Sequence, residues 1–252
     1  MLRFFRQIRQ RLLTDNKFSK YLLYAIGEIL LVVIGILIAL QVDNWNQERQ
    51  GRNEELLFLS RLREDLIVDN EYFRRRIDDA NRFIELGKKF GNKLFEKQQS
   101  LKEADSLWGL FREFDSSEML TIQNSTYSEM LYAGRLELIS NPELKSLLLE
   151  YYRESEKAAK HIAEFNSYTV DVLNIMVDRA PNIYVMETFS KNADMGFEAS
   201  YGYLNDPSSD AFEIISYASG LYTTKHQVFR DNYFKELEKL SKELINQVEA
   251  YE

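Results

Sequence analysis

An unbroken apolar run near the N-terminus constrains this chain more than any other feature of its sequence. From Tyr21 to Val42 the chain reads YLLYAIGEILLVVIGILIALQV, with Glu28 and Gln41 as its strongly polar members. As a helix, this run would span about 33 Å, which is close to the hydrocarbon thickness of a bilayer. A buried helix of a soluble protein is the alternative, but such helices are seldom apolar on every side for about six turns. We therefore expect a transmembrane helix over residues 21–42.

The charges on the two sides of this run predict its orientation. Six basic residues and one acid precede it, whereas acidic and amide side chains follow it directly. The basic residues are Arg3, Arg6, Arg9, Arg11, Lys17 and Lys20, and the acid is Asp15. The basic flank of a membrane span stays in the cytoplasm. Residues 1–20 should therefore be cytoplasmic, and residues 43–252 should form a domain on the other side of the membrane.

A cleaved signal peptide is the alternative to an uncleaved anchor. A signal peptide ends in a small-x-small cleavage pattern, and the nearest candidate, Ala39-Leu40-Gln41, ends in a large residue. The apolar run is also longer than the apolar core of a typical signal peptide. We therefore predict an anchor that remains in the membrane.

Side chains at both edges of the run suit the membrane interface. In the leader LRFFRQIRQRLL, Arg3, Arg6 and Arg9 lie away from an apolar face at helical spacing. Such a helix can lie on the inner leaflet with its arginines on anionic headgroups. A solvated basic tail that only sets topology is the alternative, and the periodicity favours the interfacial helix. Aromatic rings that favour the headgroup layer flank the run at Tyr21, Tyr24 and Trp45.

Glu28 is the residue of the run that most needs an explanation. An ionised carboxylate about 10 Å inside the hydrocarbon is costly unless it is paired, protonated or hydrated. Gly35 and Ala39 lie on nearly the same helix face, and small residues spaced by four allow helices to approach closely. Glu28, Gly35 and Ala39 are therefore a candidate contact face for another transmembrane helix. The sequence supports equally well that Glu28 snorkels to the headgroups while the small residues face lipid.

Beyond the run, the sequence predicts an all-α protein. Three prolines and ten glycines in 252 residues favour long helices over turn-rich sheets. The membrane helix should continue into a long stalk helix, because no turn cluster interrupts the chain until about Gly91. Its apolar seam suits either a coiled coil between copies or one helix of a bundle, and Asn70 in that seam can select register and oligomer state. The seam positions are Leu56, Leu59, Arg63, Leu66, Asn70, Phe73, Ile77, Ala80 and Ile84.

The remaining elements are predicted to complete an antiparallel helical bundle outside the cytoplasm. A break is expected from Gly87 to Glu103. Residues 182–207 lack a clear period and are expected to form a long excursion, the place for a binding loop or a disordered flap. Helices are predicted over residues 105–114, 124–134, 142–180, 210–219 and 221–250, and Asn141-Pro142-Glu143 is the clearest helix start.

Two segments resemble a known family. GEILLVVIGILIALQVDNWN, residues 27–46, and NSTYSEMLYAGRLELISNPELKSLLLEYY, residues 124–152, are similar to the signature segments of a family of membrane proteins of unknown function from Gram-negative Bacteroidota. The second segment carries the landmarks of that family at Asn124, Gly134, Leu138, Ile139, Tyr151 and Tyr152. The resemblance implies a single-pass inner-membrane anchor with a periplasmic domain, and it implies no activity.

The composition argues against several classes of function. The net charge is −8, and because residues 1–20 carry +5, the remainder carries −13, which would repel a nucleic acid backbone. The absence of cysteine excludes thiolate metal sites and cysteine nucleophiles. His161 and His226 stand far apart in the sequence, and Glu164 one turn from His161 is weak evidence for a metal. No phosphate loop, nucleophile elbow or zincin motif occurs, so we expect no cofactor and no enzyme.

The most promising polar and aromatic group stands around the second signature segment. It consists of Asn124, Tyr127, Arg135, Tyr151 and Tyr152. These residues could line a groove between helices, although packing in a core is the favoured interpretation.

Two functions from different classes fit the sequence. The first is a membrane-anchored interaction or assembly protein that contacts lipid and either forms a homo-oligomer or attends a larger envelope complex. The second is a sensor that binds a small ligand near residues 182–207 and acts through a membrane partner. An enzyme ranks last.

Overall fold

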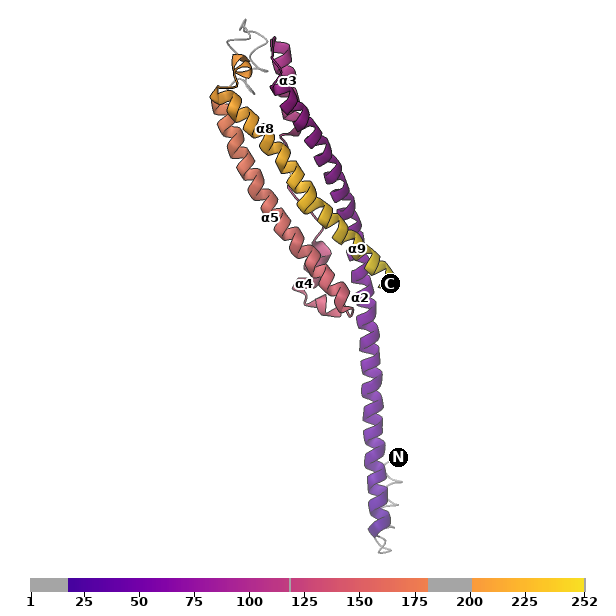
Figure 1. Cartoon of the computed structure of the whole chain (residues 1–252). Helices are drawn as coiled ribbons and strands as arrows, with labels where there is room; N and C mark the ends of the chain where they lie inside the picture. Colours follow the sequence, from indigo (N-terminus) through magenta and orange to yellow (C-terminus); the bar gives the residue numbers. More distant parts are fainter. Residues whose placement is uncertain (1–17, 118, 181–200, 252) are drawn as a thin grey trace. The chain divides into compact units, whose positions relative to one another are not determined.

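A computed structural model of the chain describes residues 18–117, 119–180 and 201–251. Every regular element in these ranges is helical and none is a strand, which confirms the predicted all-α class. The elements are α2 (Phe18–Leu94), α3 (Leu101–Phe114), α4 (Ser125–Tyr132), η1 (Arg135–Leu138), α5 (Pro142–Arg179), η3 (Gly202–Asn205), α8 (Asp210–Phe229), η4 (Arg230–Phe234) and α9 (Lys235–Tyr251) (Figure 1). The prediction of an amphipathic helix within residues 1–20 is not tested, because residues 1–17 lie outside the described residues.

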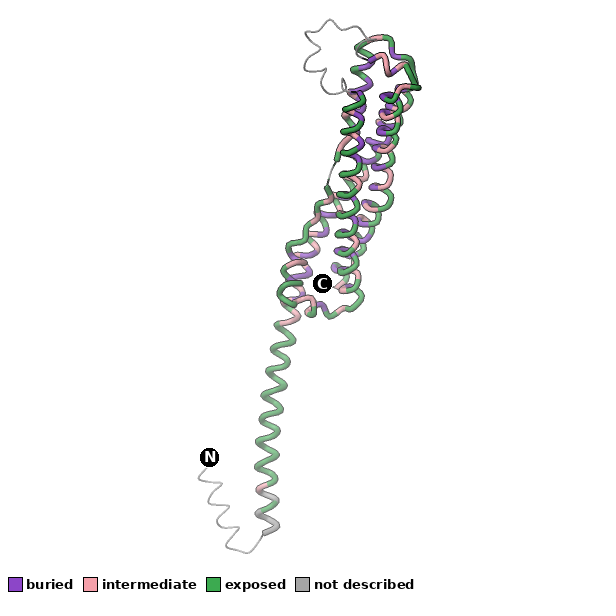
Figure 2. The backbone as a smooth tube through the Cα atoms, turned by 90° about the vertical axis from the view of Figure 1, so that its left-hand side faces the viewer, coloured by how far each residue is buried: buried purple, intermediate pink, exposed green. Residues whose placement is uncertain are grey.

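The chain divides into two compact units at Leu57. The described part of the first unit is the N-terminal part of α2, where apolar side chains are exposed on every side, and most of the tube there has the colour of exposed residues in Figure 2. Leu31, for example, is 74 % exposed. Among the described residues, α2 is the one helix that is long and apolar enough to cross a membrane, judged by length and composition.

The second unit, Phe58–Glu252, is a bundle of long helices. The C-terminal part of α2 runs in the same direction as α5, and the rod formed by α8, η4 and α9 runs in the opposite direction beside them (Figure 1). Buried side chains form two clusters along this bundle. The α3 cluster holds the last turns of α2, α3, the end of α5 and most of α8. The α4 cluster holds residues 58–73 of α2, α4, the start of α5 and α9.

The seam predicted on α2 is buried within the bundle of the same chain. Leu59, Leu66 and Phe73 are 0–1 % exposed and belong to the α4 cluster. Asn70 lies between them, and its Nδ2 donates hydrogen bonds to the Glu238 carbonyl and to Ser241 Oγ, both at 2.9 Å. The asparagine therefore fixes α2 against α9, because both hydrogens of its amide group bond to acceptors in one turn of that helix.

The capping residues place the start of α5 where the sequence predicts it. The Asn141 side chain accepts hydrogen bonds from the backbone N–H groups of Glu143 and Leu144 at 2.9 and 3.1 Å, and Pro142 fills the first turn. The helix ends at Arg179, one residue before the predicted end. Gly134 has φ of 67°, a left-handed conformation that favours glycine, and it ends the turn after α4.

The break predicted near Gly220 is wrong. Residues 210–229 form one continuous helix, and the irregularity comes later, as the wider turn η4. A glycine inside a helix costs only about 1 kcal/mol relative to alanine. The buried side chains of Ala218 and Tyr222 continue the core stripe across this position, so burial on both sides offsets the cost.

The prediction of a break after α2 is correct, but the break begins later in the sequence than expected. Helix α2 passes through Gly87 and ends at Leu94, and α3 begins at Leu101 after the cap of Ser100. Gly87 lies against α8, where a Cβ atom would come within 3.1 Å of Thr223 Cβ and closer still to its hydroxyl. The glycine therefore permits close packing of two helices and does not end one.

Candidate functional site

An extended segment between α3 and α4 crosses the bundle surface and forms one wall of the candidate site. We call residues 119–124 the strap. The backbone N–H of Gln123 donates to Asp69 Oδ1 at 2.8 Å, and the Gln123 carbonyl accepts from the Tyr152 hydroxyl at 3.2 Å. At the other end of the strap, the Tyr72 hydroxyl donates to the Met119 carbonyl at 3.0 Å. Side chains of α2 and α5 thus satisfy backbone groups that the strap cannot pair by itself.

Asp69 is the polar centre behind the strap. Its side chain is 1 % exposed, and besides Gln123 it accepts a hydrogen bond from the Tyr151 hydroxyl at 2.7 Å. Burial raises the pKa of Asp69 to about 6, against the opposing effect of the hydrogen bonds from Tyr151 and Gln123. Burial also raises the pKa of Tyr151, which stays neutral and remains the donor in this pair.

An open groove of about 790 Å³ lies between the strap, α4 and α5. We call it the tyrosine groove, because the rings of Tyr127 and Tyr152 stack in it with centroids 3.9 Å apart and planes 11° apart. Its other lining residues are Leu120, Thr121, Ile122, Asn124, Ser128, Leu131, Leu149, Arg153, Ser155, Glu156 and Ala159. The lining is mixed, with apolar and aromatic side chains beside six polar or charged ones.

The structure separates the five residues that the sequence grouped. Asn124, Tyr127 and Tyr152 line the groove. Tyr151 is fully buried behind it, and Arg135 is absent from its lining, with its guanidinium 5.8 Å from the centroid of the Phe58 ring.

Sequence reasoning missed Asp69 and the strap. A signal for Asp69 was present, because it falls between Leu66 and Phe73, one turn from each, on the side of α2 that the apolar stripe buries. A carboxylate in such a stripe predicts a buried polar contact.

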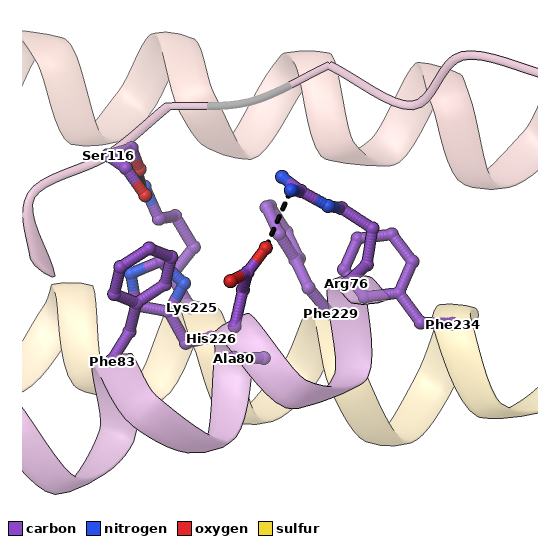
Figure 3. A pocket seen from close by; sticks show the side chains of 9 residues that line it. Arg76, Ala80, Phe83, Ser116, Lys225, His226, Phe229 and Phe234 are labelled. Atoms are coloured by element: carbon purple, nitrogen blue, oxygen red, sulfur yellow. Dashed lines mark hydrogen bonds and ion pairs between the residues drawn. The ribbon is translucent and has the colours of Figure 1, made fainter. Parts of the chain in front are cut away.

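A second polar cluster lies where α8 passes the end of α3 (Figure 3). Lys225 is 1 % exposed and its Nζ donates to the Ser116 carbonyl, while His226 Nε2 lies 2.7 Å from the Phe114 carbonyl. Because a carbonyl only accepts, Nε2 carries the proton. Burial lowers the pKa of Lys225 to about 8 and that of His226 to about 4.

This second cluster caps a helix end. Its donors satisfy carbonyls at the C-terminus of α3, the end at which positive charge is favoured. Arg76 and Asp79, one turn apart on α2, form an ion pair at 2.6 Å in the lining of the neighbouring cavity (Figure 3). That cavity has a volume of about 20 Å³, room for a single water molecule and too little for a substrate.

The two histidines lie in different surroundings. His161 Nδ1 lies 3.2 Å from the Tyr233 hydroxyl on the exposed surface, whereas His226 is buried beside Phe83. Within residues 18–117, 119–180 and 201–251, no group of three or more His, Cys, Asp or Glu side chains could hold a metal ion.

The predicted membrane residues lie on the first unit or outside the described chain. Glu28, Gly35 and Ala39 are exposed on α2, and a Cβ atom at Gly35 would meet nothing within 4 Å. Trp45 is 60 % exposed. Tyr21 and Tyr24 belong to α2, but their side chains are not described, and Arg3, Arg6 and Arg9 lie outside the described residues.

The predicted excursion of residues 182–207 lies outside the described residues up to residue 200. Its last part forms η3, where Leu204 is buried and Asn205 exchanges hydrogen bonds with the Gln98 backbone at 2.7 and 2.8 Å. An open hollow of about 810 Å³ adjoins this part, with Phe95, Phe212 and Tyr217 in its lining.

Comparison with known proteins gives one family. The model of a family of unknown function, DUF6090, matches residues 28–168, more than half of the chain. Neither a curated protein nor a solved structure matches the chain. The match begins in the apolar run and includes Asp69, the strap, α4 and the groove side of α5. The chain therefore belongs to the DUF6090 family.

Proposed function

We propose that this protein is a single-pass membrane protein whose helical bundle mediates protein association, without catalysis, in the periplasm. The exposed apolar run of α2 carries the membrane part of this proposal. Between Ile26 and Val42 the large apolar side chains are 43–74 % exposed, an area that would be costly in water and favourable in a bilayer. The backbone of this segment is helical throughout, so its polar groups are satisfied internally.

The charge distribution supports a cytoplasmic N-terminus in the inner membrane. The six basic residues before the run would remain with the cytoplasmic leaflet, and the acid-rich remainder would be exported. The bundle would meet partners outside the cytoplasm, in addition to the membrane helix itself.

Topology is tested by cysteine labelling, because the natural chain has no cysteine. Lys97→Cys places one thiol at an exposed position between α2 and α3. It should react in intact spheroplasts with a membrane-impermeant maleimide, whereas Gln7→Cys in the leader should react only after the inner membrane is opened. The reverse pattern would refute the proposed orientation.

The membrane helix is the first candidate contact in an assembly. Glu28, Gly35 and Ala39 share one face of α2, and small side chains would allow a second helix to approach its backbone. Gly35→Leu should lower crosslinked oligomer or partner yield in native membranes by blocking this approach, and Glu28→Gln tests the charge. If wild type and both variants crosslink equally, the span acts as an anchor alone.

A ligand sensor is the second candidate function. The hollow beside η3 favours it, since Phe95, Phe212 and Tyr217 offer an apolar surface at the predicted excursion. A small molecule that co-purifies with the wild-type protein and is lost with Phe212→Ser, as read by mass spectrometry, would support the sensor. Phe212 is 4 % exposed, so the variant needs a circular dichroism check that it folds.

A further inference from the structure

We infer that the strap binds an extended segment of another protein, which adds to it as a second strand and places side chains in the tyrosine groove. The inference rests on the proposed function and deepens it, since it names the chemistry of a partner and the surface that receives it. Three observations carry it, which are a row of unpaired backbone groups, an apolar surface beside them and one charge without a counterion.

The strap bonds to the bundle through one of its two edges. The Met119 carbonyl and both backbone groups of Gln123 pair with side chains of α2 and α5. In an extended chain the backbone groups of successive residues point to opposite edges, so those of Leu120 and Ile122 point away from these side chains. Among the described residues, the N–H and C=O groups of Leu120 and Ile122 have no hydrogen-bond partner. We call these four groups the free edge.

A free edge of this kind selects a polypeptide backbone. Its two N–H and two C=O groups lie on alternate residues, about 7 Å apart along the chain, which is the spacing at which an added strand presents its own donors and acceptors. An extended peptide can therefore pair with all four groups. A helix offers none, because its backbone groups are bonded internally.

The tyrosine groove adjoins the free edge, because both residues of that edge belong to its lining. The stacked rings of Tyr127 and Tyr152 lie in the groove, and Leu131 and Leu149 in its lining are 49 % and 40 % exposed. Every second side chain of an added strand points to the same face. The side chains that face the groove should be apolar or aromatic, since they would remove this apolar surface from water.

The groove also carries one charge without a counterion. Arg153 in its lining pairs with Glu154 of the same helix at 3.5 Å. Glu156 is exposed in the same lining, and it forms no ion pair within the described part of the chain. A lysine or arginine of the bound segment would complement this carboxylate. The expected partner is therefore an extended segment with apolar residues at alternate positions and a basic residue.

The experiment uses random twelve-residue peptides displayed on phage as the probe and the full-length chain in detergent micelles as the target. Selection should enrich peptides with the alternating apolar pattern and a basic residue, and fluorescence anisotropy then measures the affinity of an enriched peptide. Methylation of its backbone nitrogens at alternate residues removes donors and leaves the side chains in place. In the register that faces the strap, methylation should weaken binding by about tenfold or more, and in the other register the effect should be clearly smaller.

Variants of the chain test the same contacts from the other side. Ile122→Pro and Ile122→Ala both remove the side chain, but only proline removes the N–H group, so it should bind the peptide about 3- to 10-fold more weakly than alanine. Glu156→Lys should weaken binding by about 2- to 5-fold, and a peptide with glutamate in place of its basic residue should restore it. Val170→Ser, on α5 outside the groove lining and 42 % exposed, is the control and should change neither affinity.

Strand addition is overturned if both methylation registers bind alike, or if the proline and alanine variants of Ile122 bind alike. A selection that yields no peptide sensitive to Ile122 or Glu156 would overturn it as well. The methylated peptides are measured on the wild-type chain, so they decide the question even if the proline variant does not fold. These outcomes leave the broader function standing, because Gly35→Leu tests association separately by crosslinking in native membranes.

Discussion

The two clusters of the bundle differ in the contacts that hold their helices together. Five rings of the α3 cluster pack against one another, with neighbouring centroids 5.2–6.1 Å apart; they belong to Phe90, Trp108, Phe111, Phe114 and Tyr222. Near the α4 cluster the helices are joined by polar groups, with Asp69 bonded to the strap and to α5. Apolar contacts are tolerant of orientation, whereas hydrogen bonds fix one arrangement. The α3 cluster should therefore supply stability, and the polar contacts around the α4 cluster should fix the wall of the groove.

The largest effect should come from the α3 cluster. Phe111 is fully buried among four aromatic rings. Phe111→Ala should lower the free energy of unfolding by about 3–5 kcal/mol, because it leaves a cavity that rigid rings cannot fill. Denaturant unfolding of the full chain in detergent measures this. Phe95→Ala, at a ring that is 70 % exposed, is the control and should cost about 1 kcal/mol or less. Similar losses at the two sites would contradict the assignment of stability to this cluster.

A smaller effect is expected where α2 and α8 meet most closely. Gly87→Ala should cost about 1–3 kcal/mol, because its new Cβ would collide with Thr223, whose hydroxyl also donates to the Ser219 carbonyl at 2.8 Å. Gly91→Ala, one turn later, meets nothing within 4 Å and should stabilise the helix by about 0.5–1 kcal/mol. A loss of stability for Gly87→Ala and a gain for Gly91→Ala would show that packing against Thr223, and not helix propensity, decides the effect at Gly87. Thermal unfolding of both variants decides the point.

The buried carboxylate of Asp69 makes the stability of the folded chain depend on pH. Its pKa in the folded chain is raised to about 6, so folding favours the neutral acid. Its contribution to stability is therefore greatest below the ordinary pKa of 3.8 and is lost as the pH rises through about 6.

Asp69→Asn removes this dependence without removing the contacts. The amide oxygen can accept from Gln123, and the amide nitrogen can donate to the Tyr151 oxygen. At pH 8 the variant should be more stable than the wild type by about 1–2 kcal/mol, and the difference should vanish near pH 4. Unfolding curves measured between pH 4 and pH 8 test this. Parallel curves would mean that Asp69 is solvated when charged.

The sequence predicted the elements of this fold better than their contacts. The apolar run, the Asn141 cap and the stripe on α2 are local signals, and each led to a helix with correct or nearly correct bounds. The strap has no hydrophobic periodicity. Its position depends on Asp69, which lies 54 residues before Gln123 in the sequence and accepts a hydrogen bond from the Gln123 N–H. For the same reason the groove was only partly anticipated. Tyr127 and Tyr152 occur in one recognisable segment, whereas the place of Arg135 depends on the distant Phe58 ring.

The smallest effect should follow from Asn70, which tests whether the seam of α2 packs within one chain or between copies. An asparagine in a seam can select the oligomer state of a coiled coil, but here its amide bonds to Glu238 and Ser241 of the same chain. The Glu238 carbonyl also accepts from Ser241 Oγ at 2.9 Å, so it keeps a partner if the amide is removed.

Asn70→Leu should therefore change the free energy of unfolding by no more than about 1 kcal/mol, because added apolar burial offsets the lost hydrogen bonds. The yield of oligomer crosslinked in native membranes should be unchanged, since the seam lies within one chain. If Asn70→Leu instead lowered that yield, α2 would be paired between copies. The contacts of Asn70 with α9 would then be made, in part, by the second chain.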